Sequence, residues 1–215
     1  PISTPHSTST QAMTTTLLEN VDPSAQMMIG EFRHKEGDQF ASVQFSMPMI
    51  HFSAPLTSKY GVNPNFEANG RFPLELSITP EIEDQITKIE DHIKKQFTDY
   101  SHHWFKKDKK ATPYVFSRMV RDTDEGTVLK VKLNKDTMMK ILSEDGTTIK
   151  SDEATIAHVN RHCKILPFLQ SYSLWIDTQK KTYGCSLTAK ILLIIPGVRE
   201  DVFESMLQNA GYCYE

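Results

Sequence analysis

Basic and aromatic side chains alternate between Trp104 and Arg121, in a pattern that suits binding of single-stranded nucleic acid. Six cations stand there against one acid, Asp108, in a chain whose formal net charge is −3. Cations neutralise phosphates, and flat rings stack on unpaired bases of any sequence. The predicted phosphate contacts are Lys106, Lys107, Lys109, Lys110, Arg118 and Arg121, and the predicted stacking residues are Trp104, Phe105, Tyr114 and Phe116. The pattern also fits a solvated lysine loop beside core aromatics.

A second aromatic and basic group follows near the carboxyl end. Its members are Tyr172, Trp175, Lys180, Lys181 and Tyr183. A solvent-facing aromatic on a barrel strand flanked by lysines is typical of oligonucleotide-binding sheet faces. Trp175 fits a core position equally well.

Alternation in the run TVLKVKL adds two more cations. Lys130 and Lys132 lie on one side of this expected strand, and Leu129, Val131 and Leu133 lie on the other. The lysine side is therefore predicted to face solvent or ligand, at the edge of the same groove.

Catalytic and metal sites have weaker support. His158 and His162 are four residues apart beside Cys163, but no second ligand pair has metal-site spacing. The sequence has no GxxxxGK or GxGxxG phosphate loop and no recognisable nucleophile elbow. We predict a protein that is not an enzyme and uses no metal or cofactor, and a metal-dependent enzyme built on these three residues is a rival interpretation.

Composition restricts the cellular setting. The pI near 6.3 argues against a histone-like protein that coats duplex DNA by bulk charge. No apolar run reaches the roughly 18 residues needed to span a bilayer, and no signal peptide is recognisable. Cys163, Cys185 and Cys213 are widely spaced and odd in number, which favours reduced thiols. A soluble intracellular protein is expected.

The clearest element is a helix predicted over Thr79–Phe97. Thr79 suits the N-cap and Pro80 the first helical position. An apolar stripe follows at helical spacing, and it consists of Ile82, Ile86, Ile89, Ile93 and Phe97. This stripe predicts packing on a core.

Short strands separated by turns make up most of the remaining sequence. They are predicted over residues 41–52, 73–78, 114–120, 127–133, 139–142, 163–169, 171–176 and 183–195. Residues 53–72, rich in Gly, Pro and Asn, are expected to form a loop or a loosely paired excursion. The pattern predicts an α+β chain, mainly β, with a small barrel or sandwich.

Three segments are expected along the chain. Residues 1–26 are rich in Ser and Thr, and we expect them to be disordered. Residues 27–197 would form the binding domain, with the helix inserted. Residues 198–215 would form an amphipathic helix and a short tail.

Four segments resemble, in the same order, the single-stranded DNA-binding proteins of nucleocytoplasmic large DNA viruses. These segments are FSMPMIHFSAPLTSKYGV, RFPLELSITPEIEDQITKIEDHIKKQF followed by Trp104, TPYVFSRMVRDTDEGTVLKVKLN, and HCKILPFLQSYSLWIDTQKKTYGCSLTAKILLI. The resemblance covers about residues 41–195 and extends remotely to phage single-strand binding proteins. It implies a five-stranded OB-fold barrel that binds single-stranded DNA in replication, recombination or repair.

Some questions remain open at this point. RNA is an alternative ligand, because stacking serves both nucleic acids. The Ser-rich start and the helix-like end depart from the family pattern, which leaves a homo-oligomer and contacts with replication proteins open. A viral structural or scaffold protein is the main alternative function.

Overall fold

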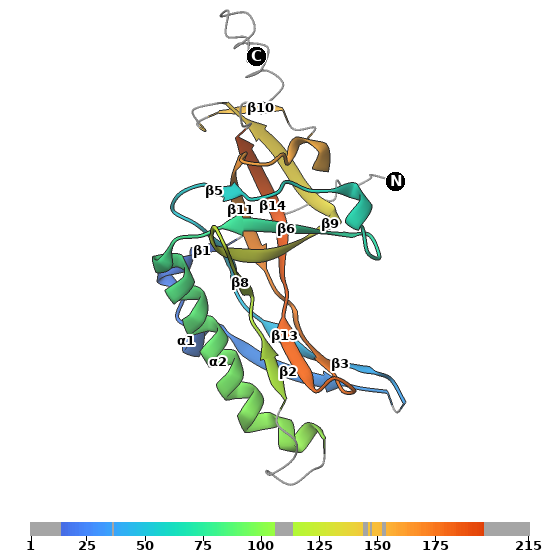
Figure 1. Ribbon diagram of the computed structural model, residues 1–215. Coiled ribbons are helices and arrows are strands. Elements are labelled where there is room, and N and C mark those ends of the chain that lie inside the picture. Colours follow the sequence, from blue (N-terminus) through green and yellow to red (C-terminus); the bar gives the residue numbers. More distant parts are fainter. Residues whose placement is uncertain are drawn as a thin grey trace, which may run out of the picture.

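Two β-sheets and one long helix make up the described part of the chain. The computed structural model describes residues 14–35, 37–105, 114–143, 146, 148–151 and 154–195. The larger sheet lies in the upper part of Figure 1 and the smaller sheet below it, with helix α2 alongside the smaller sheet. This confirms the predicted α+β class that is mainly β.

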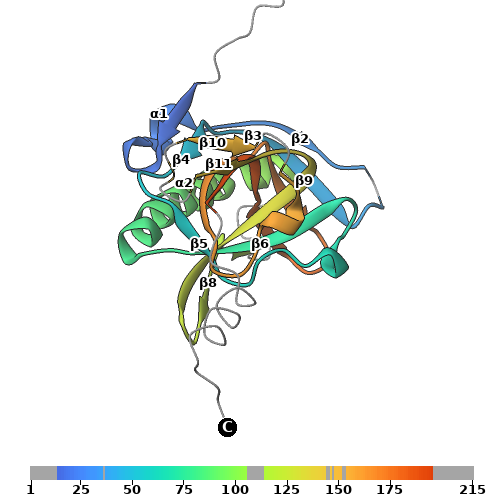
Figure 2. The ribbon, with the colours of Figure 1, turned by 90° about the horizontal axis from the view of Figure 1, so that it is seen from above.

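Five strands of the larger sheet pair in a closed ring. They are β5 (Leu56–Ser58), β6 (Arg71–Ser77), β9 (Gly126–Leu142), β11 (Lys164–Gln170) and β14 (Leu187–Ile195). Antiparallel pairs join β5 to β6, β6 to β9, β14 to β11 and β11 back to β5, whereas β9 and β14 run parallel. Figure 2 looks down on this ring, with β5, β6, β9 and β11 around its interior. Closure pairs the strands without leaving a free edge in the ring.

Four short strands extend the ring. They are β1 (Thr15–Leu17), β4 (Met49–His51), β8 (Val120–Thr123) and β10 (Ile149–Ser151). The larger sheet therefore has nine strands, so a five-stranded barrel describes only part of it.

Strand alternation sorts the side chains of the ring as the sequence predicts. Leu129, Val131 and Leu133 are buried on the inner side of β9, facing the same core as Leu74 and Leu76 of β6. The outward positions between them are left for polar residues.

The smaller sheet is built from segments far apart in the sequence. Its order is β2 (Met28–Arg33), β3 (Phe40–Ser46), β12 (Ser173–Asp177), β13 (Thr182–Cys185) and β7 (Val115–Ser117). One side of it packs against α2, where the ring of Phe97 stacks on Tyr183 with centroids 3.6 Å apart.

Helix α2 spans Pro80–Trp104 and begins where the sequence predicts. The Oγ1 atom of Thr79 accepts the N–H of Ile82, which caps the first turn. The helix ends at Trp104, past the predicted end at Phe97, because Trp104 continues the buried side and stacks on Phe32 of β2, with centroids 5.6 Å apart.

One expectation about local structure is wrong. Residues 14–26 contain β1, a 3-10 turn (Leu18–Asn20) and the short helix α1 (Pro23–Gln26), and the side chain of Leu18 is buried. Apolar anchoring and the parallel pairing of β1 with β4 therefore order a segment rich in Ser and Thr. Residues 53–72 contain the short ring strand β5 and a 3-10 turn (Pro64–Phe66), which fits the paired alternative rather than a plain loop.

Other expectations fall partly outside the described residues. Residues 1–13 and the predicted helix over 198–215 lie there, so both stay predictions.

Burial raises the pKa of the Cys163 thiol to about 11 and that of Cys185 to about 12, which keeps both protonated at neutral pH. No helix in the described residues is long and apolar enough to cross a bilayer.

Candidate nucleic-acid interface

The outer side of β6 and β9 carries three cations on two adjacent strands. Arg71, Pro73 and Glu75 alternate with the buried residues of β6, and Lys132 and Lys130 lie opposite Pro73 and Glu75 on β9. We call these five residues the β6–β9 face. Successive outward residues on a strand lie about 6.6–6.8 Å apart, so the cations form a row along the strands.

A pocket of about 280 Å³ opens on this face, between the ring and the smaller sheet. Four predicted residues line it: Arg118, Lys130, Lys132 and Trp175. They belong to the β7–β8 link, to β9 and to β12, so the fold brings together cations and an indole from distant parts of the sequence. We call this cavity the Trp175 pocket.

The indole of Trp175 packs against Gly184 of the neighbouring strand. The two residues are directly opposite in the β12–β13 pairing. A Cβ at Gly184 would lie 2.7 Å from Cζ2 of the indole and 3.1 Å from the carbonyl oxygen of Ser117. The absence of a side chain at Gly184 therefore determines where the indole of Trp175 lies in the pocket.

Replacing Gly184 by alanine is expected to displace this indole and destabilise the fold by about 1–3 kcal/mol, as overpacking does. Urea unfolding measures the loss, and tryptophan emission in a Trp104→Phe background reports the displacement. Gly30→Ala is the matched control in the same sheet, because its nearest neighbours, Cβ and Oε1 of the exposed Gln44, lie at 3.3 Å rather than 2.7 Å, so it should cost less. Unchanged stability and emission in Gly184→Ala would contradict this role.

The two predicted arginines are already paired with carboxylates. Arg118 donates from Nη2 to Glu83 at 3.1 Å and from Nε to the fully buried Glu90 at 3.2 Å. Arg121 forms an ion pair with Glu75. A bound phosphate would have to share these cations, so they offer less free charge than their number suggests.

The two lysines of the face are the better candidates for phosphate contact. Within the described residues, no carboxylate oxygen lies within 4 Å of either ammonium group, and Lys132 Nζ donates to Ser186 at 2.9 Å. Burial lowers the pKa of Lys130, and this outweighs the opposite influence of the Glu90 carboxylate. Burial also lowers the pKa of Lys132, and the charge of Arg71 lowers it further.

These lowered pKa values predict a pH dependence of anion binding. The ammonium forms bind phosphate, so affinity should be complete at neutral pH and fall as pH rises through the lowered pKa values, before exposed lysines titrate near 10.5. A pH series between about 7 and 10 with a labelled oligonucleotide tests this. The Lys130→Arg/Lys132→Arg variant should flatten the profile, because guanidinium stays charged throughout. The same fall in both proteins would refute the assignment.

The other predicted aromatic residues lie elsewhere. Trp104, Phe105, Tyr114, Phe116 and Tyr183 pack on one another and on Phe32 and Phe97. Tyr183 precedes Gly184 in β13, so its side chain points to the opposite side of the sheet from the indole of Trp175. Only 4% of Tyr183 is exposed. Tyr183 therefore cannot stack on a base, and the cluster anchors the end of α2 instead of joining the Trp175 pocket.

The remaining cations and Tyr172 also lie outside the pocket. Lys180 is exposed in the β12–β13 turn, while Lys181 Nζ lies 5.3 Å from the ring centroid of Tyr114. Tyr172 is exposed between β11 and β12, with Lys190 Nζ 4.8 Å from its ring centroid. The four lysines Lys106, Lys107, Lys109 and Lys110 lie outside the described residues and stay a prediction.

Sequence reasoning missed several residues of the site. Arg71, Pro73, Glu75, Ser117 and Ser186 lie on the face or line the pocket. The alternation in RFPLELS does indicate that Arg71, Pro73 and Glu75 share one side of a strand. It does not indicate that this strand pairs with β9.

The histidines of the rival metal-site interpretation have other roles. Nδ1 of His158 accepts the backbone N–H of Thr155 at 3.1 Å, which closes a capping box. Cys163 is fully buried, and His162 is exposed in a left-handed turn with φ of 64°. Among the described residues, no group of three or more His, Cys, Asp or Glu side chains could hold a metal ion.

Three solved structures show a distant similarity to this chain. The single-stranded DNA-binding protein gp2.5 of bacteriophage T7 matches with a TM-score of 0.47 and 14% identity, over 75% of this chain and 94% of that protein. The single-stranded DNA-binding protein of bacteriophage Enc34 matches with a TM-score of 0.39 and 10% identity, over 80% and 92%. Its complex with single-stranded DNA matches with a TM-score of 0.38 and 11% identity, over 75% and 88%.

No protein-family model and no curated protein sequence matches this chain. The structural similarities are too distant to assign a family, and these neighbours come from bacteriophages. The resemblance to proteins of large DNA viruses therefore stays a prediction. The assignment of function rests on the strand pairing and side chains of this chain.

Proposed function

We propose that this chain binds single-stranded DNA without catalysis and without sequence preference along most of its site. The observation that carries the proposal is the Trp175 pocket, where an indole lies beside Lys130, Lys132 and Arg118. Lysines on the β6–β9 face would neutralise phosphates, and the indole would stack on a base. Protection or organisation of single strands in replication, recombination or repair is the role that suits such binding.

The connections of the ring support this proposal. We infer an OB-fold in which β5, β6, β9, β11 and β14 are the first to fifth strands, closed by the parallel pairing of the third and fifth. Oligonucleotides bind OB-folds on the face of the second and third strands and at the loop between the fourth and fifth. Here that face is β6–β9, and that connection contains β12 with Trp175.

A fluorescence titration tests the proposal. In a Trp104→Phe background, emission reports Trp175 alone, because the chain has two tryptophans. Oligothymidylate is expected to quench this emission, and the logarithm of its binding constant should fall linearly with the logarithm of salt concentration. A duplex of the same length should bind more weakly, because its bases are not free to stack.

The other arms of the titration separate the alternatives. Equal binding of an RNA oligonucleotide would widen the ligand to single strands of either kind. The absence of any quenching or salt-sensitive binding by oligonucleotides would reject the proposal. Stable self-association in the same samples would then favour the structural or scaffold role.

A further inference from the structure

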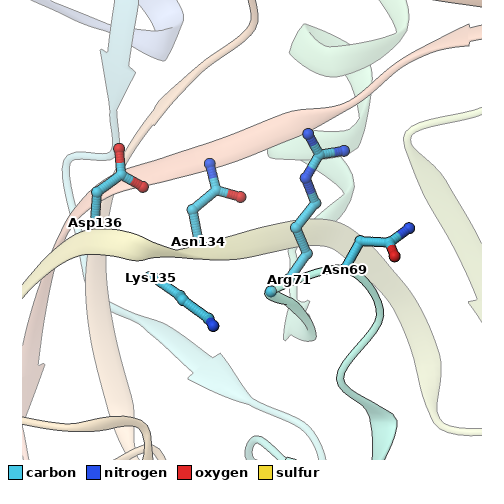
Figure 3. Close-up of a pocket in the computed structure, with 6 residues that line it drawn as sticks. Asn69, Arg71, Asn134, Lys135 and Asp136 are labelled. Atoms are coloured by element: carbon cyan, nitrogen blue, oxygen red, sulfur yellow. The ribbon is translucent and has the colours of Figure 1, made fainter.

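A second pocket, of about 380 Å³, lies farther along the β6–β9 face, beyond Lys132. Its lining residues are Asn69, Gly70, Arg71, Asn134, Lys135 and Asp136. Figure 3 shows the side chains of Arg71, Asn134 and Asp136 on one side of β9 and that of Lys135 on the other. We call this cavity the Asn134 pocket.

One wall of the Asn134 pocket is a bulge in β9. The pairing with β14 passes from Leu133 to Met138 on β9 across a single residue of β14. Thr137 closes the bulge, because its Oγ1 accepts the Asn134 N–H at 2.9 Å and donates to the Ala189 carbonyl at 2.9 Å. Bulges of this kind redirect side chains beside binding sites.

The opposite wall is a tight turn at the start of β6. Asn69 and Gly70 have φ of 53° and 73°, and Ala68 and Arg71 exchange both backbone hydrogen bonds across them. This is the geometry of an Asn-Gly hairpin turn. Lys135 packs over Gly70, where a Cβ would lie 3.2 Å from its Cε. The bulge and the turn thus fix the two walls of the pocket.

The polar groups of the pocket suit a nucleobase better than a phosphate. Oδ1 of Asn134 is buried and has no hydrogen-bond partner, so it is an acceptor that requires a donor. Arg71 supplies donors, and Asp136 supplies further acceptors on the same side as Asn134. The charges of Arg71 and Asp136 offset each other, and Lys135 is paired with Glu67 at 4.0 Å, which favours a neutral ligand that has both donors and acceptors.

We propose that the Asn134 pocket takes a base with an exocyclic amine, adenine or cytosine, from the strand bound on the β6–β9 face. The amine would donate its two hydrogens to Asn134 Oδ1 and Asp136, while Arg71 would donate to the adjacent ring nitrogen. Thymine presents a carbonyl at that position and would leave both acceptors unpaired. This inference rests on the proposed function and adds a base preference at one position.

The test compares oligothymidylate with the same oligonucleotide carrying one central cytosine. The oligonucleotide can bind in several registers, so it can place its single cytosine at the Asn134 pocket if that contact raises the affinity. The cytosine strand is expected to bind at least about fivefold tighter. A strand with 2-pyrimidinone, which is cytosine without its amine, should bind like oligothymidylate.

Variants tie this preference to the pocket. Asn134→Ala should bring the affinity ratio of the two strands to about one, while Asn134→Asp should keep it because the acceptor oxygens remain. Lys164→Ala is the control, since this exposed lysine of β11 lines neither pocket, and it should keep the wild-type ratio. Because the ratio compares two strands on one protein, a change in folding stability does not mimic the effect.

The outcomes distinguish this inference from the proposed function. If both strands bind wild-type protein equally tightly, or if Asn134→Ala keeps the preference, the inference is overturned and single-strand binding stands. If neither strand binds, the proposed function itself fails, and the base preference fails with it.

Discussion

Replacing Lys130 and Lys132 together by alanine is expected to weaken binding of oligothymidylate roughly 60-fold at about 50 mM salt and roughly tenfold at about 200 mM. Each phosphate contact on a single strand contributes a slope of about −0.7 to the logarithm of affinity against the logarithm of salt concentration. Two lost contacts therefore make the slope less negative by about 1.4, and the deficit shrinks as salt rises. The salt series measures affinity and slope together.

A pair of lysines on the exposed side of α2 provides the control. Lys88 and Lys95 are exposed, seven residues apart, and neither lines the Trp175 pocket. Lys88→Ala/Lys95→Ala changes the net charge by the same amount, so it should lower affinity much less and leave the slope nearly unchanged. Equal losses in the two double variants would show that bulk charge, and not the β6–β9 face, governs binding.

Local periodicity was sufficient to predict the elements that carry the site. The cap at Thr79 and the isoleucine stripe placed the start and the buried side of α2 correctly. The alternation in TVLKVKL placed Lys130 and Lys132 on the outer side of β9. Both patterns depend on residues close in sequence, which is why sequence alone can predict them.

The arrangement of these elements depends on long-range pairing, which periodicity does not encode. β5 has only three residues and lies between loops, yet it closes the ring by pairing with β6 and β11. The position of Trp175 depends on Gly184, which becomes its neighbour only when β12 pairs with β13. The pocket therefore could not be predicted from either segment alone.

The aromatic residues after α2 show why residue type is a weak guide to function. Trp104 and Phe105 beside a lysine run suggest a stacking site, but both rings contact Phe32 of β2. Phe32 lies more than seventy residues earlier in the chain, so the sequence does not show that it occupies these faces. A ring is a candidate for stacking on a base only where the fold leaves it at a cavity or at the surface, and Trp175 lines a pocket.

Replacing the buried Glu90 by alanine is expected to destabilise the fold by about 3 kcal/mol. Its Oε1 accepts the Met119 N–H at 2.6 Å, and Arg118 donates to its Oε2 at 3.2 Å. Alanine would leave the Met119 N–H buried without a partner and create a cavity. Arg118 is half exposed and would still be paired with Glu83. The loss of stability should therefore lie at the lower end of the range for broken buried ion pairs.

Glu90→Gln separates the hydrogen bond from the charge. Glutamine keeps the volume and an acceptor for the Met119 N–H, so this variant should lose only about 1 kcal/mol. Urea unfolding measures both losses, and the melting temperature of Glu90→Ala should fall by roughly 6–12 °C. The Met119 carbonyl accepts the Lys130 N–H at 2.9 Å, so Glu90→Ala should also weaken oligothymidylate binding below its melting temperature. Equal destabilisation by glutamine and alanine would mean that the charge on Glu90, rather than its bond to Met119, holds this rim of the Trp175 pocket in place.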